Sequence, residues 1–132
     1  MEKLLLYTGK DIQKITMDAW LKDKAPELRP IVLKWFDEIK NCGEDVQGIF
    51  HDGYPIGCVE NAPFAYVNAF TSHVNVGFFY GASLYDKNGL LEGTGKNMRH
   101  VKIKPGVSYA EIEIKILIKA AYGDIKRRLR EI

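Results

Sequence analysis

The sequence has few of the features that mark membrane, secreted or metal-stabilised proteins. It contains only 2 cysteines and 5 prolines in 132 residues. Its longest apolar runs extend over a few residues, whereas about 20 are needed to cross a bilayer. The N-terminus has no small-residue cleavage site of the kind that ends a secretory signal. No charge sign dominates either, because 19 basic residues face 17 acidic ones. These absences exclude transmembrane and disordered chains, and we expect a cytoplasmic protein with no membrane partner.

The two cysteines lie too far apart for a local metal or redox motif. Cys42 and Cys58 are separated by 16 positions, and neither has a second cysteine nearby. Zinc ribbons and redox motifs need paired, closely spaced cysteines. We therefore expect two free thiols without a catalytic role.

What is present fits one folded unit over residues 1–132. Domains commonly span roughly 100 to 200 residues, and 46% hydrophobic residues can supply a core. Residues 1–60 carry 8 basic and 11 acidic side chains, and residues 61–132 carry 11 and 6. Much of the basic excess falls in the run 126–130, where cations favour the C-terminal end of a helix. A nucleic-acid patch would need a wider basic face with interleaved aromatics, so we do not expect a nucleic-acid partner.

Two helices are predicted near the N-terminus. Apolar residues recur at three- and four-residue steps over 11–24, at Ile12, Ile15, Ala19 and Trp20. A second stripe follows, with Pro30 in the first turn and Gly43 as a left-handed cap. The apolar residues of that stripe are Ile31, Trp35, Phe36 and Ile39.

An antiparallel meander is predicted over residues 46–79, followed by a short strand over 99–104. Runs rich in Val, Phe, Tyr and Ile alternate with turn residues there. Residues two apart share a face of a strand. This rule places Phe64, Tyr66 and Phe70 on one face of their strand, and it places Val74, Val76 and Phe78 on one face of the next.

Residues 111–118 alternate charged and Ile side chains, which would also suit a strand. Ser108 and Glu111 have capping-box spacing, so we predict a helix over 108–122 with a further turn or helix to the end. The fold class expected from these elements is α+β. It comprises an antiparallel sheet of about five strands, two N-terminal helices and one or two C-terminal helices.

The glycine-rich loop 89–100 carries the densest functional signal. Glycines allow close backbone approach to a ligand, and neighbouring cations could hold an anion. The pattern lacks the glycine and hydroxyl positions of a P-loop and the third glycine of a dinucleotide fingerprint. We therefore predict a non-enzymatic binding protein with a small anionic ligand here. Its candidate ligand-binding residues are Gly93, Gly95, Lys96, Arg99 and His100.

Two runs in the sequence resemble the YdhG-like family of small, mostly bacterial domains of unknown function. They are HVNVGFFYG at 73–81 and GLLEGTGKNMRH at 89–100, and the resemblance covers about residues 25–122. It implies an α+β fold with helices flanking an antiparallel sheet. Relatives often carry Trp-Gly-x-Pro where this chain has His51-Asp52-Gly53-Tyr54-Pro55.

Two alternatives to the anionic ligand remain open. Some members of the family are described as frataxin-like intracellular iron chaperones, which implies iron bound by surface carboxylates. The available acids are Asp37, Glu38, Glu44, Asp45, Asp52 and Glu60. A protein-interaction module is the second alternative, and an exposed aromatic patch around Phe78 to Tyr80 would favour it.

Overall fold

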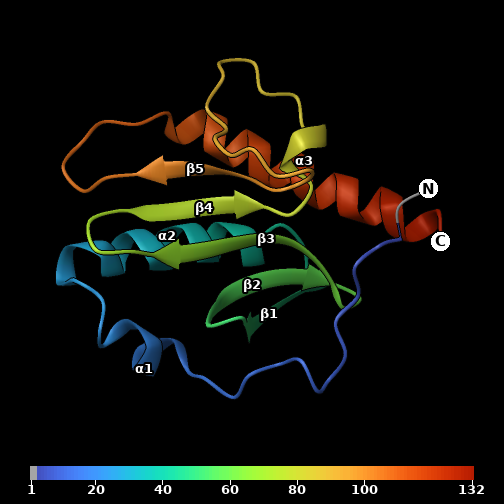
Figure 1. Ribbon diagram of the computed structural model, residues 1–132, viewed down its shortest axis with the longest axis horizontal. Coiled ribbons are helices and arrows are strands. Elements are labelled where there is room, and N and C mark those ends of the chain that lie inside the picture. Colours follow the sequence, from blue (N-terminus) through green and yellow to red (C-terminus); the bar gives the residue numbers. More distant parts are fainter. Residues whose placement is uncertain (1–2) are drawn as a thin grey trace.

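The computed structural model describes residues 3–132 and has one five-stranded antiparallel sheet with helices against one face (Figure 1). The strands lie in chain order: β1 (Val46–His51), β2 (Tyr54–Val59), β3 (Ala62–Ala69), β4 (Val74–Phe78) and β5 (Arg99–Ile103). The helices are α1 (Met17–Leu21), α2 (Arg29–Lys40) and α3 (Glu111–Arg130), with 3-10 turns η1 (Pro26–Leu28) and η2 (Gly81–Ser83). The α+β fold class is confirmed. Within residues 3–132, no helix has the length and apolar character needed to span a bilayer.

The main core lies between the sheet and the two long helices. It includes fully buried side chains from α2, β4, β5 and α3, such as Trp35, Phe78, Ile103 and Ile118. The predicted face of Val74, Val76 and Phe78 is confirmed, because all three belong to this core. Burying apolar surface of this extent is the dominant favourable contribution to folding.

Two tight turns connect β1, β2 and β3. Asp52 and Gly53 have φ values of 56° and 87°, and Glu60 and Asn61 have φ values of 48° and 68°. Positive φ at both central residues is the signature of the type I′ turn, which matches the twist of antiparallel strands. The first of these turns fixes the orientation of His51 and Tyr54, which lie opposite each other in the register.

A β-bulge corrects the predicted face of β3. Pro63 pairs with Cys58 and Ala65 pairs with Gly57, so Phe64 is an extra residue in β3. A bulge of this kind shifts the alternation of side chains. Phe64 consequently packs in the helix-side core, whereas Tyr66 lies on the opposite, open face. The prediction that these two residues share a face was wrong.

The predicted helix over 11–24 was also wrong for most of its length. Only Met17–Leu21 is helical, and the Thr16 hydroxyl caps it by accepting from the Ala19 amide at 3.2 Å. The preceding segment is extended because it pairs with the sheet: the Gln13 amide donates to the Phe50 carbonyl at 2.8 Å. Tertiary pairing has overridden the helical periodicity.

The second helix is confirmed with Pro30 in its first turn, but its predicted glycine cap is not. Gly43 does not have a positive φ. A Cβ at that position would overlap the Tyr122 hydroxyl, so close packing against α3 explains the glycine.

The C-terminal helix begins later than predicted, and the further helix expected after residue 122 continues it to Arg130. It starts at Glu111 without a side-chain cap, so the expected capping role of Ser108 was wrong. It continues without a break to Arg130 and places the basic run in its last turns. The alternating Ile pattern reflects two faces of one helix, because Ile114 and Ile118 are buried while Ile112 and Ile116 are exposed.

Candidate functional site

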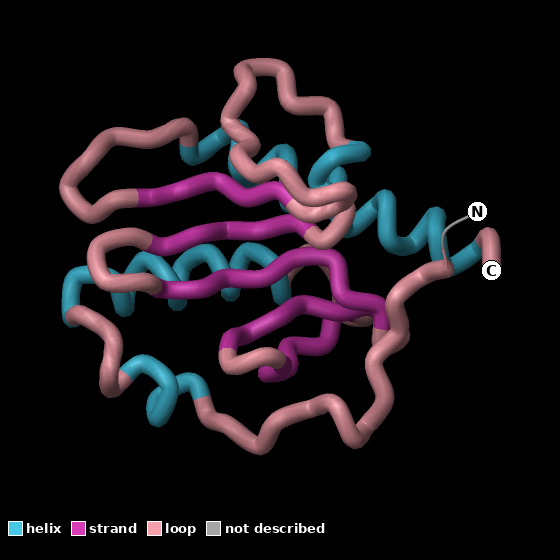
Figure 2. Tube along the Cα trace, in the orientation of Figure 1, coloured by secondary structure: helices cyan, strands magenta, loops and turns pink. Residues whose placement is uncertain are grey.

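The glycine-rich segment forms a long loop between η2 and β5, as predicted (Figure 2). The loop returns to the sheet through Glu92 and His100, whose backbone amides and carbonyls exchange hydrogen bonds of 2.8 and 3.0 Å. Two hydrogen bonds from Arg99 Nη1 then close the end of the loop on itself. They run to the carbonyl oxygens of Gly95 at 2.5 Å and Met98 at 2.6 Å.

The predicted anion-binding residues occupy different positions around this loop. Arg99 is directed to the loop's own carbonyls, whereas the alternation of β5 places His100 on the open face of the sheet opposite Gly77. Gly93 and Gly95 lie exposed in the loop, and φ at Gly93 is 123°. Lys96 is exposed as well. The arrangement brings no convergent set of these cations to one point.

The C-terminal end of the same loop lines a cavity of about 430 Å³ that the sequence reasoning missed. Asn97 and Met98 meet the β1–β2 turn and the N-terminal segment there. We call this cavity the aromatic pocket, because half of its ten lining residues carry rings. Its ring-bearing residues are Tyr7, His51, Tyr54, Phe79 and Tyr80, and its remaining lining residues are Lys3, Leu5, Asp52, Asn97 and Met98.

The N-terminal segment holds the hairpin side of the pocket in place. The Tyr7 ring stacks on the His51 imidazole with centroids 4.0 Å apart. Around the turn itself, the Gly53 amide donates to Gln13 Oε1 at 2.8 Å, and Trp20 Nε1 donates to the Gly53 carbonyl at 2.6 Å. These contacts use a segment far away in sequence, so no local motif could have predicted the pocket.

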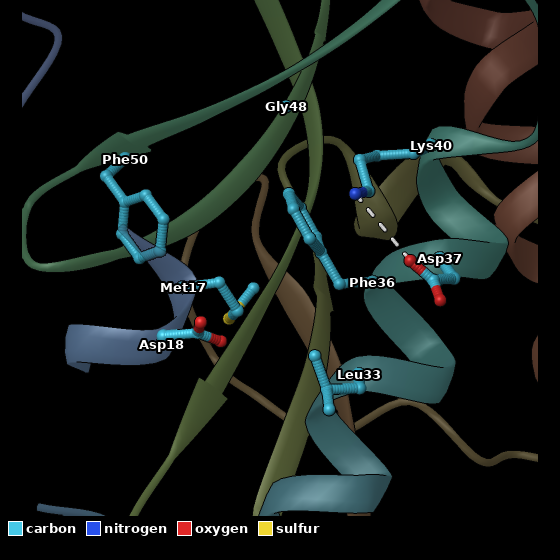
Figure 3. A pocket seen from close by; sticks show the side chains of 8 residues that line it. All are labelled: Met17, Asp18, Leu33, Phe36, Asp37, Lys40, Gly48 and Phe50. Atoms are coloured by element: carbon cyan, nitrogen blue, oxygen red, sulfur yellow. Dashed lines mark ion pairs between the residues drawn. The ribbon is translucent and has the colours of Figure 1, made fainter. Parts of the chain in front are cut away.

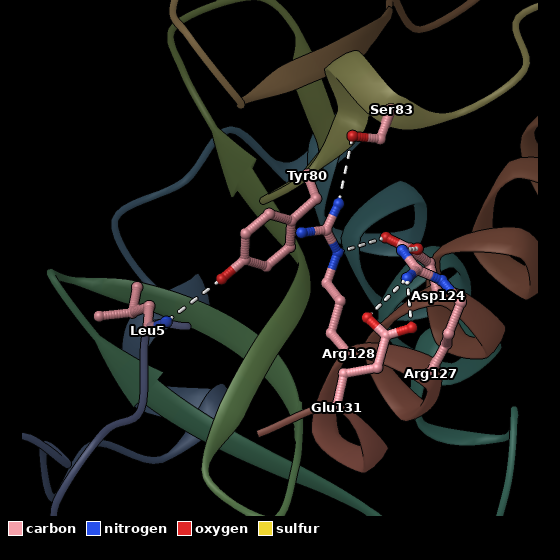
Figure 4. A network of polar contacts seen from close by, with 7 residues as sticks. All are labelled: Leu5, Tyr80, Ser83, Asp124, Arg127, Arg128 and Glu131. Carbon is pink, nitrogen blue, oxygen red and sulfur yellow. Dashed lines mark hydrogen bonds and ion pairs between the residues drawn. The ribbon is translucent and has the colours of Figure 1, made fainter. Parts of the chain in front are cut away.

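A network from α3 supports the wall that Tyr80 forms (Figure 4). The Arg128 guanidinium lies 4.2 Å from the Tyr80 ring centroid and donates to Ser83 Oγ at 3.2 Å. Arg128 Nε also donates to Asp124 at 2.8 Å, and the Tyr80 hydroxyl accepts from the Leu5 amide at 3.3 Å. Part of the C-terminal basic run therefore positions the pocket.

The polar groups of the pocket are mostly hydrogen-bond donors. Burial, with a smaller contribution from nearby Asp52, raises the pKa of Tyr54, and burial also raises the pKa of Tyr7. Both phenols thus stay protonated at neutral pH. His51 Nδ1 is buried without a hydrogen bond, although Asp52 Oδ2 lies 3.1 Å away at ion-pair distance. A ligand with acceptor atoms would match this set.

A second cavity of about 370 Å³ lies between α1, α2 and β1 (Figure 3). Apolar side chains form much of its wall, and the ion pair of Lys40 and Asp37, 3.6 Å apart, lies at one side. It contains Met17, Leu33, Phe36 and Phe50 but no ring pair or unpartnered polar atom. The aromatic pocket is therefore the better candidate site.

The candidate iron ligands do not gather. Within residues 3–132, no three His, Cys, Asp or Glu side chains are arranged to hold a metal ion. Several of the acids instead face cations: Glu38 lies 3.7 Å from Lys115, and Asp45 lies 3.0 Å from Lys126. A hydrogen bond from the Tyr122 hydroxyl also lowers the pKa of Asp45.

Neither the two thiols nor the aromatic residues at the end of β4 have the properties of a functional site. Both cysteines are free, and burial raises the pKa of Cys42 to about 11 and that of Cys58 to about 12. Neither thiol is therefore activated as a nucleophile. Phe78 and Phe79 are buried, so the patch that would have favoured an interaction module is not exposed.

Comparison with known proteins adds no assignment. No family model, curated protein or solved structure matches the chain. The resemblance to the YdhG-like family accordingly stays a prediction, and the function has to be argued from the geometry.

Proposed function

We propose that the protein is a cytoplasmic, non-enzymatic binding protein whose ligand is a small planar organic anion seated in the aromatic pocket. The observation that carries the proposal is the convergence of rings from three separate segments on one cavity beside the glycine-rich loop. Pockets for small molecules are commonly concave and apolar with a few placed polar groups. This proposal keeps the predicted anionic ligand but moves it from the loop's glycines to the loop's end.

The chemistry of the wall supports a ring that bears an acceptor group. Aromatic side chains favour stacked or edge-on contact with a second ring. The protonated phenols of Tyr7 and Tyr54 and the ammonium of Lys3 offer donors to a carboxylate or a similar group. Asp52 opposes an anion, but its side chain is 66% exposed and solvent screens it.

The test is an amide NMR titration with three probes of similar ring and different charge: benzoate, benzamide and benzyltrimethylammonium. We expect benzoate to bind most tightly and to shift the amides of Tyr7, His51, Phe79 and Met98. A cation that binds more tightly than benzoate would contradict the anionic ligand. Shifts that avoid the pocket with every probe, or no shifts at all, would contradict the proposal as a whole.

Two exposed side chains provide matched charge variants. Lys3→Gln removes a positive charge from the pocket and should weaken benzoate binding by roughly two- to fivefold, the range expected of a screened charge. Asp52→Asn removes a negative charge and should strengthen binding by a similar factor. Equal benzoate affinity in the parent protein and in both variants would exclude an electrostatic role for these two side chains.

A further inference from the structure

A second surface lies on the open face of β3, β4 and β5 and adjoins the aromatic pocket through ring contacts of Tyr66 with Tyr54 and Phe79. In the register Asn68 lies opposite Asn75, and Asn75 lies opposite Lys102. Val74 and Ile103, the alternate residues, face the helices. One step along the strands, the Phe70 amide donates to the His73 carbonyl at 2.9 Å, which extends the pairing to the β3–β4 turn. We call this surface the open-face strip: Tyr66, Phe70, His73, Asn75, Lys102 and Lys104.

One aromatic ring of this strip, Phe70, is exposed and available for stacking. Phe70 stacks on His73 with ring centroids 4.8 Å apart and an angle of 17° between the rings. Phe70 is 45% exposed although it is a large apolar side chain. Tyr66 lies over Gly77, where any Cβ would overlap its ring. The glycine thus leaves room for the Tyr66 ring, which also packs against Tyr54 and Phe79.

The edge strand supplies positive charge beside these rings. Lys102 and Lys104 are exposed, and neither forms an ion pair with another residue of the described chain. Both lie near His73: burial is the main cause that lowers the pKa of His73, and the charges of Lys102 and Lys104 add to it. Glu92 is the acidic group that acts on this histidine from the loop.

A buried polar atom without a partner lies within the strip. Asn75 is only 8% exposed, and its Oδ1 makes no hydrogen bond. A buried acceptor of this kind is costly unless a donor reaches it. Because this oxygen is also shielded from solvent, the amino or imino group of a nucleic-acid base reaches it only if the Asn75 side chain turns toward the open face.

We propose that the open-face strip binds single-stranded nucleic acid. Bases stack on the exposed Phe70–His73 pair, and phosphates contact Lys102 and Lys104. Stacking on a sheet requires unpaired bases, which favours a single strand over a duplex. A nucleic-acid surface combines exposed cations with exposed aromatic rings. The C-terminal run does not do so, because Arg127 and Arg128 pair with Asp124 and Glu131. The open-face strip places the exposed Lys102 and Lys104 beside the stack of Phe70 on His73.

The test is fluorescence anisotropy of the full chain with a labelled oligoadenylate of about ten nucleotides. Its comparison probes are an abasic strand of the same length, a duplex and heparin. We expect the single strand to bind about tenfold more tightly than the abasic strand or the duplex. If heparin, the duplex and the abasic strand bind as tightly as the oligoadenylate, charge attraction alone accounts for binding, and the proposal is overturned. No binding of any strand at low salt would overturn it as well.

Matched surface variants locate the site. The double variant Lys102→Ala, Lys104→Ala should make the slope of log K against log salt concentration less steep by about 1.4. Each phosphate contact on a single strand contributes about 0.7 to that slope. The control removes two exposed lysines from the N-terminal segment, Lys10→Ala with Lys14→Ala, and should leave the slope unchanged. An equal effect of the two pairs would overturn the proposed location.

A second pair of variants tests the stacking rings. Phe70→Ala should weaken binding about tenfold, within the range measured for loss of one stacked base. Tyr85→Ala, at a ring that is 83% exposed elsewhere, should leave it unchanged. Because both rings are exposed, neither variant is expected to unfold the protein. Unchanged affinity in Phe70→Ala would contradict stacking on the strip.

Discussion

The two faces of the sheet differ in kind. The face covered by α2 and α3 buries only hydrophobic side chains in its core. The open face carries phenols, imidazoles, amides and lysines beside a smaller buried cluster of Tyr7, Ile56, Cys58 and Phe79. The two buried side-chain atoms of residues 3–132 that lack a hydrogen-bond partner, His51 Nδ1 and Asn75 Oδ1, both lie there. Locally unfavourable features of this kind are expected at functional sites. We therefore expect stability to depend mainly on the helix-covered face, and both proposed binding surfaces lie on the open face.

The largest expected effect tests the helix-covered face. Phe78 is fully buried against the helices, and Phe78→Ala should lower the free energy of unfolding by about 3–5 kcal/mol, the cost of a large cavity. Phe70→Ala, on the open face, should lower it by less than about 1 kcal/mol. Urea denaturation followed by circular dichroism measures both. Similar losses in the two variants would break the distinction between the faces.

A smaller effect is expected where the faces share a strand. Gly77→Ala places a methyl group against the Tyr66 ring and should cost about 1–3 kcal/mol, the range for overpacking. The cost should fall markedly in a Tyr66→Ala background. Gly123→Ala is the control: its Cβ meets no atom within 4 Å on α3, so it should stabilise the protein by about 0.5–1 kcal/mol. Additive effects of Gly77→Ala and Tyr66→Ala would show that the ring does not require the glycine.

The features of the fold that depend on local pattern were predictable. The α2 stripe and the β4 face followed from periodicity and were confirmed. The order β1-β2-β3-β4 follows from short connections, two of which are turns with left-handed residues, whereas β5 joins β4 after a long loop. What failed was set by distant partners. The 11–24 periodicity gave way to pairing of Gln13 with Phe50, and the bulge at Phe64 reversed the face of Tyr66.

The site was predictable only in part, for a similar reason. The glycine-rich loop does border a cavity, but through Asn97 and Met98 rather than through its glycines and cations. Arg99 carries the expected charge, yet nearby carbonyls of the loop accept its hydrogen bonds. The stack of Tyr7 on His51 joins two distant segments. No spacing rule relates such residues before the chain has folded.

The buried thiol of the open face makes a prediction about pH. Burial raises the pKa of Cys58 from 9.0 to about 12, so above pH 9 the unfolded chain releases this proton while the folded chain retains it. Stability is therefore complete below pH 9 and falls as the pH rises toward 12. At pH 10 the loss should be about 1.4 kcal/mol, one pKa unit. Denaturation at pH 8 and pH 10 should show this loss in the parent protein but not in Cys58→Ala. An equal loss in both proteins would assign it to other groups.

The smallest effect on stability is expected at Arg99. Its guanidinium donates to the Gly95 and Met98 carbonyls in an exposed loop, so Arg99→Gln should change the free energy of unfolding by less than about 0.5 kcal/mol, as is usual at the surface. Amide exchange over 94–98 should nevertheless accelerate, because loop opening is local. Titration with inorganic phosphate separates this role from anion binding. A structural Arg99 leaves the loop amides of the parent protein and the variant equally insensitive to phosphate. Shifts that occur only in the parent would instead make Arg99 an anion ligand, and the open face would then share its binding role with the loop.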